Sequence, residues 1–141
     1  MSDPVVALLG RTRRIAMVGA SDRPGRASFG VMRFLIERGY VVTPVNPVLA
    51  GQRIHGELVV ATLAEAAPLD MVDVFRRSEA AGALADEAVR LGAKSVWMQL
   101  GVRDDAAAVR AEAAGLQVVM DACPVIEWRR HGLPDQAAMI S

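Results

Sequence analysis

The chain has 141 residues, 52% of them hydrophobic, and its 16 basic and 16 acidic side chains give a formal net charge of zero. This length suits one domain, and the apolar content excludes disorder over most of the chain. A zero net charge argues against a general nucleic-acid or membrane-surface binder, which needs a basic face. No apolar run approaches the roughly 20 residues that span a bilayer, and residues 1–10 do not read as a secretory signal. We therefore expect a cytoplasmic protein.

The reactive side chains exclude several kinds of site. Cys123 is the single cysteine, so a disulfide framework or a cysteine-based metal site within one chain is excluded. The two histidines, His55 and His131, fall in a loop and near the chain end, and we expect neither to bind metal or act as a catalytic base. No catalytic constellation is visible, so we predict a protein that is not an enzyme.

Short apolar runs alternate with helical patterns along the chain. We predict strands over residues 15–18, 40–45, 58–60, 71–75, 95–99 and 116–120. We predict helices over residues 29–38, 78–91, 104–114 and 123–130, one or two helical turns over 63–67, and a short arm or helix over 1–10. Ser78 is the expected N-cap of its helix, and the paired acids Asp104 and Asp105 suit a helix N-terminus. Asp73 falls in mid-strand, where an acid needs a structural partner.

This alternation predicts an α/β fold, a Rossmann-like doubly wound parallel sheet of five or six strands with helices on both faces. The expected strand order is 3-2-1-4-5-6. We predict one domain over residues 1–131 and a flexible tail over 132–141. The apolar pair Met139-Ile140 in that tail leaves both a monomer and a homodimer open.

The loop after the first strand carries the main functional indication. In a doubly wound sheet, ligands bind at the carboxyl ends of the strands where the strand order reverses. Small residues here let an anion approach the backbone, the next helix offers unpaired N–H groups, and the arginines and serines add donors. A tight turn that needs small residues is the structural alternative. The candidate ligand-binding residues of this loop are Gly19, Ala20, Ser21, Arg23, Gly25, Arg26 and Ser28.

The loop departs from the two common nucleotide-binding motifs. It lacks the G-x-G-x-x-G spacing, and the second strand ends in Pro44-Val45-Asn46-Pro47 without the acid that binds a ribose hydroxyl. It also lacks the Gly-Lys-Ser/Thr of a Walker loop. These differences argue against a dinucleotide ligand, and we keep an NAD(P)-dependent oxidoreductase-type domain only as a second hypothesis.

Six stretches at predicted strand ends resemble the small stand-alone CoA-binding proteins, whose domain is similar to the N-terminal domain of the succinyl-CoA synthetase α subunit. The matching residues cover roughly 14–130. They are Val18-Gly19-Ala20-Ser21, Gly39-Tyr40-Val41-Val42, Pro44-Val45-Asn46-Pro47, Val72-Asp73-Val74-Phe75-Arg76-Arg77, Val96-Trp97-Met98-Gln99-Leu100-Gly101 and Val119-Met120-Asp121-Ala122-Cys123. The family often has Arg where this chain has Ala122, so a role for that Arg does not carry over.

The resemblance implies coenzyme A as the ligand and a role for each strand end. Residues 19–28 would hold the diphosphate, and Asn46-Pro47 would border the adenosine. Phe75, Arg76 and Arg77 would line the opposite wall, and Gln99 to Gly101 would contact the pantetheine side. The candidates for the CoA 3′-phosphate are Arg23, Arg26 and Arg53. Each has a structural alternative: Phe75 can be core, and Arg76-Arg77 a solvated pair.

The resemblance also sets the expected partners. We predict a non-catalytic module, sensor or carrier for CoA or an acyl-CoA, with an acyl-CoA enzyme as a possible partner; a subunit of a multi-chain acyl-CoA ligase is a further alternative. Cys123 follows the last strand and can begin a helix, where a thiolate is favoured. It could form a mixed disulfide with CoA, the alternative being a small buried core residue.

Overall fold

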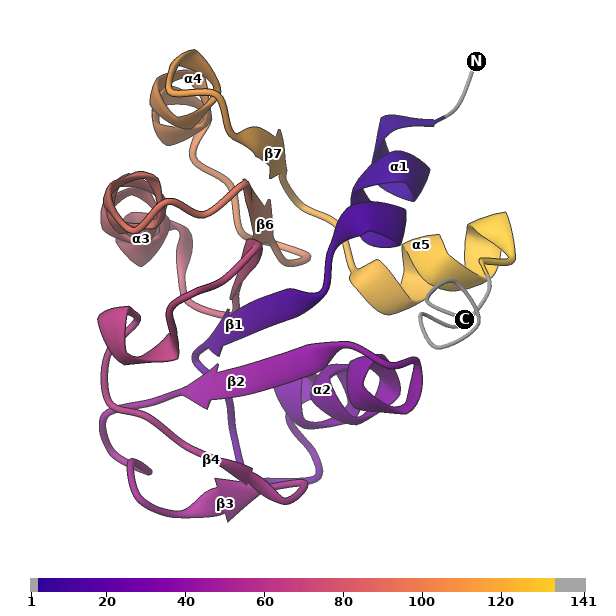
Figure 1. Ribbon diagram of the computed structural model, residues 1–141, viewed down its shortest axis with the longest axis vertical. Coiled ribbons are helices and arrows are strands. Elements are labelled where there is room, and N and C mark those ends of the chain that lie inside the picture. The colour runs from indigo at the N-terminus through magenta and orange to yellow at the C-terminus, as the bar shows by residue number, and fades with distance from the viewer. Residues whose placement is uncertain (1–2, 134–141) are drawn as a thin grey trace.

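The computed structural model describes residues 3–133, in which a five-stranded parallel sheet lies between two layers of helices (Figure 1). The strands are β1 (Arg14–Val18), β2 (Val41–Val45), β5 (Met71–Val74), β6 (Ser95–Met98) and β7 (Gln117–Val119). Their spatial order is β2-β1-β5-β6-β7, and every neighbouring pair is parallel. The α/β prediction is confirmed, and the strand order reverses between β1 and β5.

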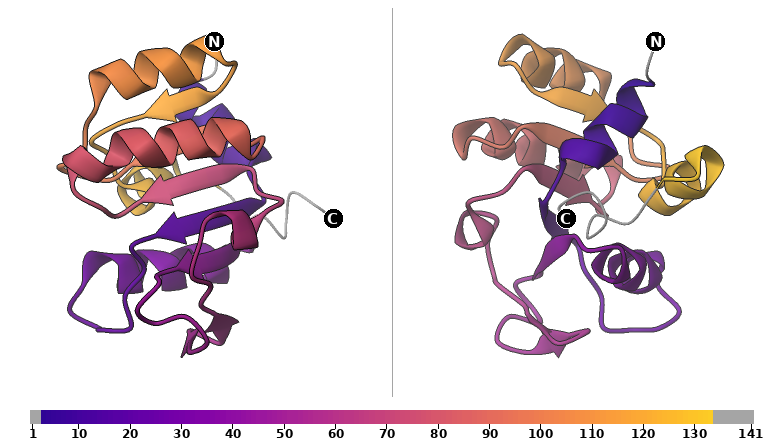
Figure 2. Two further views of the ribbon diagram at one scale, coloured as in Figure 1. Left: turned by 90° about the vertical axis from the view of Figure 1, so that its left-hand side faces the viewer. Right: turned by 45° about the vertical axis from the view of Figure 1, so that its right-hand side comes forward.

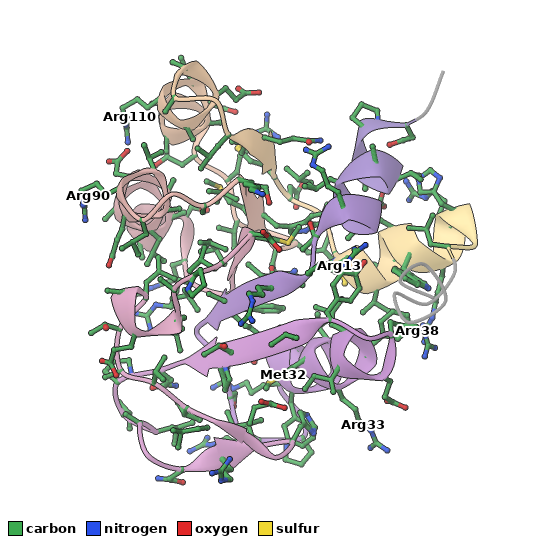
Figure 3. The ribbon with its side chains drawn as sticks, in the orientation of Figure 1. Arg13, Met32, Arg33, Arg38, Arg90 and Arg110 are labelled. Carbon is green, nitrogen blue, oxygen red and sulfur yellow. The ribbon has the colours of Figure 1, made fainter. Side chains whose placement is uncertain are left out.

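Each face of the sheet has its own helices (Figure 2). One face carries α1 (Pro4–Arg11), α2 (Ala27–Glu37) and α5 (Pro124–His131), and the other carries α3 (Ser78–Arg90) and α4 (Asp105–Ala113). Figure 3 shows Arg33, Arg90 and Arg110 projecting outward from α2, α3 and α4, while Met32 is completely buried. The helices therefore present apolar faces to the sheet and charged faces outward.

Alternate residues of the central strands supply the two cores, because successive side chains of a strand point to opposite faces. Val72 and Val74 belong to the core under α3 and α4, and Met71 belongs to the core under α1, α2 and α5. Asp73 has the same parity as Met71 and pairs in register with Met17 and Trp97, both of which lie in the second core. A fully buried carboxyl group is thus part of the α2 side of the sheet.

The predicted third strand is wrong in its extent. The 58–60 segment contributes to a separate antiparallel hairpin, β3 (Arg53–Ile54) with β4 (Glu57–Leu58), and then makes one parallel bridge between Val60 and Val45. Val60 N donates to the carbonyl oxygen of Pro44 at 3.0 Å. Because Pro44 has no N–H, this outer edge of β2 lacks one donor that a longer parallel strand would need.

The ends of the four long predicted helices lie within two residues of the predicted bounds, but the predicted N-cap of α3 is wrong. Arg77 is its N-cap residue, and Ser78 is already helical. The Ser78 hydroxyl instead accepts a 3.0 Å hydrogen bond from Arg103 N and donates to the Gly101 carbonyl oxygen at 3.3 Å, so it joins α3 to the loop after β6. Asp104 caps α4 as expected, since its side chain accepts from a backbone N–H of the first turn. A short 3-10 turn, η1 (Ala64–Ala66), confirms the helical turn predicted near residue 65. Most of the predicted tail, with Met139-Ile140, lies outside the described residues.

Candidate ligand-binding site

The loop between β1 and α2 brings backbone N–H groups to the carboxyl edge of the sheet. Gly19 has φ +88°, and a Cβ there would overlap the carbonyl oxygen of Phe75, so this position requires glycine. Ser21 Oγ accepts a 3.1 Å hydrogen bond from Arg23 N. Arg26, the N-cap residue of α2, makes no side-chain cap hydrogen bond. The N-terminus of α2 therefore lacks a side-chain cap within the described part of the chain, and its first N–H groups, together with the positive end of the helix dipole, suit an anion.

Asn46 ties this loop to the end of β2. Its Nδ2 donates to the Ala20 carbonyl oxygen at 2.9 Å, and its Oδ1 accepts from Val48 N at 2.9 Å. The amide therefore fixes two loops against each other through the backbone. The same position carries an acid in dinucleotide-binding proteins, where it holds the ribose hydroxyls.

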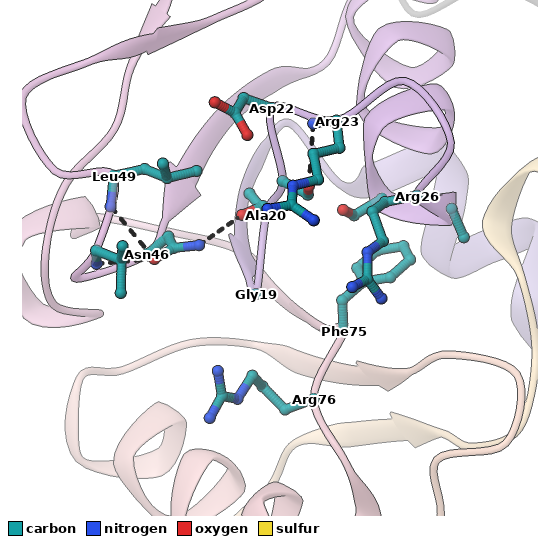
Figure 4. Close-up of a pocket in the computed structure, with 13 residues that line it drawn as sticks. Gly19, Ala20, Asp22, Arg23, Arg26, Asn46, Leu49, Phe75 and Arg76 are labelled. Carbon is teal, nitrogen blue, oxygen red and sulfur yellow. Dashed lines mark hydrogen bonds between the residues drawn. The ribbon is translucent and has the colours of Figure 1, made fainter.

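A cavity of about 500 Å³ opens between the two loops and the segment after β5; we call it the β1-loop cavity (Figure 4). It brings together nine of the predicted site residues: Gly19, Ala20, Ser21, Arg23, Arg26, Ser28, Asn46, Phe75 and Arg76. Sequence reasoning missed its remaining members: Asp22, Ala27, Val48 and Leu49. The first two lie inside the predicted loop, and the last two directly follow Pro47. Their closeness in sequence to predicted site residues was therefore the signal that could have identified them.

Three guanidinium groups reach this cavity, from Arg23, Arg26 and Arg76 (Figure 4). Within residues 3–133, none of the three is paired with a carboxylate, whereas several arginines elsewhere are. Asp22 is the one acidic residue in the lining. The site therefore has a local excess of positive charge in a protein whose net charge is zero.

A second cavity of about 420 Å³ adjoins the first on the other side of the sheet edge; we call it the α3 cavity. Gly19, Asn46 and Arg76 line both, so the two spaces meet over the end of β1. The lining is largely apolar, and the predicted residue Pro47 belongs to it. Glu87 of α3 is its carboxylate. Its other members are Val18, Val45, Ala61, Thr62, Leu63, Ala80, Ala83 and Leu84.

The structure does not bring five predicted residues into either cavity: Gly25, Arg53, Arg77, Gln99 and Gly101. Arg53 lies on β3, and its Nη1 donates to a carbonyl oxygen of the same hairpin at 3.0 Å. Arg77 is the N-cap residue of α3, and Gly101 lies in the turn after β6. Gly25 lies in the loop after β1, between the lining residues Arg23 and Arg26, but does not itself line either cavity.

Gln99 is buried and donates a hydrogen bond to Asp73. Its Nε2 donates a 2.8 Å hydrogen bond to Asp73 Oδ1, while Asp73 Oδ2 has no hydrogen-bond partner among the described residues. Burial raises the pKa of the Asp73 carboxyl from 3.8 to about 7, against the smaller opposing effect of the Gln99 hydrogen bond. The expected structural partner of Asp73 is therefore Gln99.

The two histidines make local structural contacts. His55 Nε2 lies 2.8 Å from the Phe29 carbonyl oxygen, with the two rings 4.2 Å apart between centroids. His131 Nε2 lies 3.7 Å from Asp3 Oδ2. Among residues 3–133, no three His, Cys, Asp or Glu side chains gather as a metal site. Cys123 is buried and is the N-cap residue of α5, as the sequence suggested.

Comparison with known proteins decides the family. A model of the CoA-binding domain matches residues 13–129. The chain belongs to this CoA-binding domain family. YneT of Bacillus subtilis (strain 168) is 38% identical over 117 residues, which cover 82% of this chain and 85% of that protein. A Thermus thermophilus protein of known structure is 38% identical with a TM-score of 0.82, covering 88% of this chain and 93% of that one.

A larger enzyme shares the fold alone. The acetyl-coenzyme A synthetase 1 of Ca. Korarchaeum cryptofilum has a TM-score of 0.67 at 20% identity, and the match covers 83% of this chain but 28% of the synthetase. The CoA-binding domain of this chain thus corresponds in fold to one part of a much longer protein. None of the helices within residues 3–133 is long and apolar enough to cross a membrane.

Proposed function

We propose that this protein binds coenzyme A at the carboxyl ends of β1, β2 and β5, as a binding module, sensor or carrier without catalysis of its own. The diphosphate lies on the N-terminus of α2, in the β1-loop cavity. The adenosine extends past Asn46 and Pro47 into the apolar α3 cavity. Membership of the CoA-binding domain family supports the choice of ligand.

One observation carries the proposal: three guanidinium groups that have no carboxylate partner among residues 3–133 line a cavity at a helix N-terminus. CoA has a diphosphate and a 3′-phosphate, so it carries more negative charge than a dinucleotide with a diphosphate alone. Arginines bind phosphate oxygens through paired, charge-assisted hydrogen bonds. Of these residues, Arg76 lines both cavities and so lies where the diphosphate and the ribose 3′-phosphate come closest. Arg53, a sequence candidate for the 3′-phosphate, is outside both cavities.

The NAD(P)-type alternative is less well supported. Asn46 occupies the place of the ribose-binding acid, and its amide is already engaged with the backbone of both loops. The ligase-subunit alternative predicts a stable complex with an ATP-binding protein. Co-purification of such a partner from the native source would favour it over a stand-alone module.

Isothermal titration calorimetry of the purified protein with CoA, dephospho-CoA and NAD tests the proposal. We expect CoA to bind more tightly than dephospho-CoA, because the latter lacks the 3′-phosphate, and NAD to bind weakest. Equal affinities for CoA and dephospho-CoA would contradict the role of the 3′-phosphate. Tighter binding of NAD than of CoA would overturn the choice of ligand.

A further inference from the structure

A third cavity, of about 490 Å³, runs between α2 and α5; we call it the α2–α5 groove. Its wall is mostly apolar and comes from Ala27, Gly30, Val31 and Phe34 on α2 and from Val125 and Ile126 on α5. Ile126 is 46% exposed and lies in this wall. Charged side chains lie at its rim, including the Arg33–Glu37 ion pair of α2.

Gly30 keeps this groove open. It is the fourth residue of the 11-residue helix α2, and glycine inside a helix costs about 1 kcal/mol relative to alanine. No neighbouring atom demands a glycine there, since a Cβ would have nothing within 4 Å. Backbone geometry does not require glycine either, because the φ of Gly30 is not in the left-handed region. Neither packing nor backbone geometry therefore explains why this residue is glycine. A larger side chain at position 30 would occupy the free space of the groove.

The groove begins where the β1-loop cavity ends. Ala27, the first residue of α2, lines both spaces. Cys123, the N-cap residue of α5, lines the groove and is 9% exposed. Neighbouring cavities therefore share lining residues: Arg76 lines the first two, and Ala27 lines the β1-loop cavity and the groove.

We propose that the α2–α5 groove holds the apolar end of an acyl-CoA, so that the ligand of this protein is a thioester with a hydrocarbon acyl chain. The inference rests on the proposed CoA binding. With the diphosphate at the N-terminus of α2 and the adenosine in the α3 cavity, the pantetheine arm leaves on the side of Ala27. An acyl chain on its sulfur then continues between α2 and α5, where it covers Ile126 and the apolar wall.

Calorimetry with CoA and octanoyl-CoA on the full-length protein tests this assignment. Each pair of methylenes that the groove removes from water raises affinity by about tenfold. We therefore expect octanoyl-CoA to bind at least about tenfold more tightly than CoA. Equal affinities would overturn the proposal while leaving CoA binding intact, whereas a failure to bind CoA would instead contradict the proposed function.

Gly30 supplies a matched pair of variants. Gly30→Leu should fill the groove and abolish the advantage of octanoyl-CoA while leaving the affinity for CoA within about twofold of wild type. Gly30→Ala should retain most of that advantage. Both should raise the melting temperature of the free protein, because they replace a glycine inside a helix, so lost binding cannot be attributed to unfolding.

Other occupants of the groove give different results. If the acyl chain lies elsewhere, Gly30→Leu will leave the advantage of octanoyl-CoA unchanged. If a second copy of the chain covers the groove, sedimentation will show a dimer that Gly30→Leu dissociates. If residues 134–141 cover it, octanoyl-CoA will gain its advantage only after their deletion. Each of these three outcomes would overturn the proposal.

Discussion

The side-chain amide of Gln99 donates a 2.8 Å hydrogen bond to the buried carboxyl group of Asp73. The two residues come from neighbouring strands, β5 and the end of β6, and they point to the α2 side of the sheet beside Met17 and Trp97. Among residues 3–133 only one carboxyl oxygen of Asp73 has a hydrogen-bond partner, and burial raises the pKa of this group to about 7. The group is therefore protonated in the folded protein over a pH range in which it is ionised in the unfolded chain.

This difference predicts a stability that decreases as pH rises. Between about pH 4 and pH 7 the folded state holds a proton that the unfolded chain releases, so the free energy of unfolding falls across this window. The shift from 3.8 to about 7 corresponds to about 4 kcal/mol as an upper figure. Urea unfolding at several pH values should show Asp73→Asn with a flatter profile than wild type in this window. Parallel profiles for the two proteins would contradict the prediction.

The glycines of the β1 loop should differ in their tolerance of a side chain. Gly19→Ala adds a Cβ that overlaps the Phe75 carbonyl oxygen at a positive φ, so we expect a loss of about 2 kcal/mol or more in the free energy of unfolding. Gly25→Ala is the control in the same loop, because a Cβ there has no neighbour within 4 Å. Its effect should stay within about 0.5 kcal/mol. A similar loss in both variants would mean that the loop itself, rather than the contact with Phe75, is sensitive.

The β1 loop could be predicted from sequence because its chemistry is local. A buried strand, a run of small residues and a helix follow one another within residues 14–38, and strand-order rules place that loop at the ligand edge. The prediction for Arg76 depended on the resemblance, yet it too relied only on the position of a strand end. Such residues share the cavity because the carboxyl ends of parallel strands lie together.

Other features of the structure could not be predicted from sequence, because they depend on side-chain direction and on packing between distant segments. Gln99 lies at a strand end like Arg76, but its side chain points into the core, where the buried Asp73 needs a donor. The α2–α5 groove is lined by residues far apart in the sequence, such as Ala27 and Cys123, and sequence periodicity cannot predict that they line one groove. The short third strand depended on Pro44, whose missing N–H lies on the edge that a further strand would use.

Arg76 should determine the preference for CoA over dephospho-CoA. Arg76→Gln removes the guanidinium that lines both cavities, and a charge-assisted hydrogen bond of this kind corresponds to about tenfold in affinity. We expect CoA binding to weaken by about that factor and dephospho-CoA binding to change less, as measured by calorimetry. Arg77→Gln is the matched control, since the adjacent Arg77 lines neither cavity. Equal losses for the two ligands would assign Arg76 to the diphosphate instead.

Cys123 should form a mixed disulfide with CoA if the pantetheine arm enters the α2–α5 groove. Its thiolate would attack one sulfur of CoA disulfide, forming the protein–CoA disulfide and releasing CoA thiolate, so no further oxidant is needed. Because Cys123 is only 9% exposed, exchange should depend on binding and should be faster with CoA disulfide than with glutathione disulfide. Intact-protein mass spectrometry should show one added CoA on wild type and none on Cys123→Ser. The absence of added mass on wild type, or the same adduct on Cys123→Ser, would contradict the prediction, and equal rates with both disulfides would show that bound CoA does not direct the exchange.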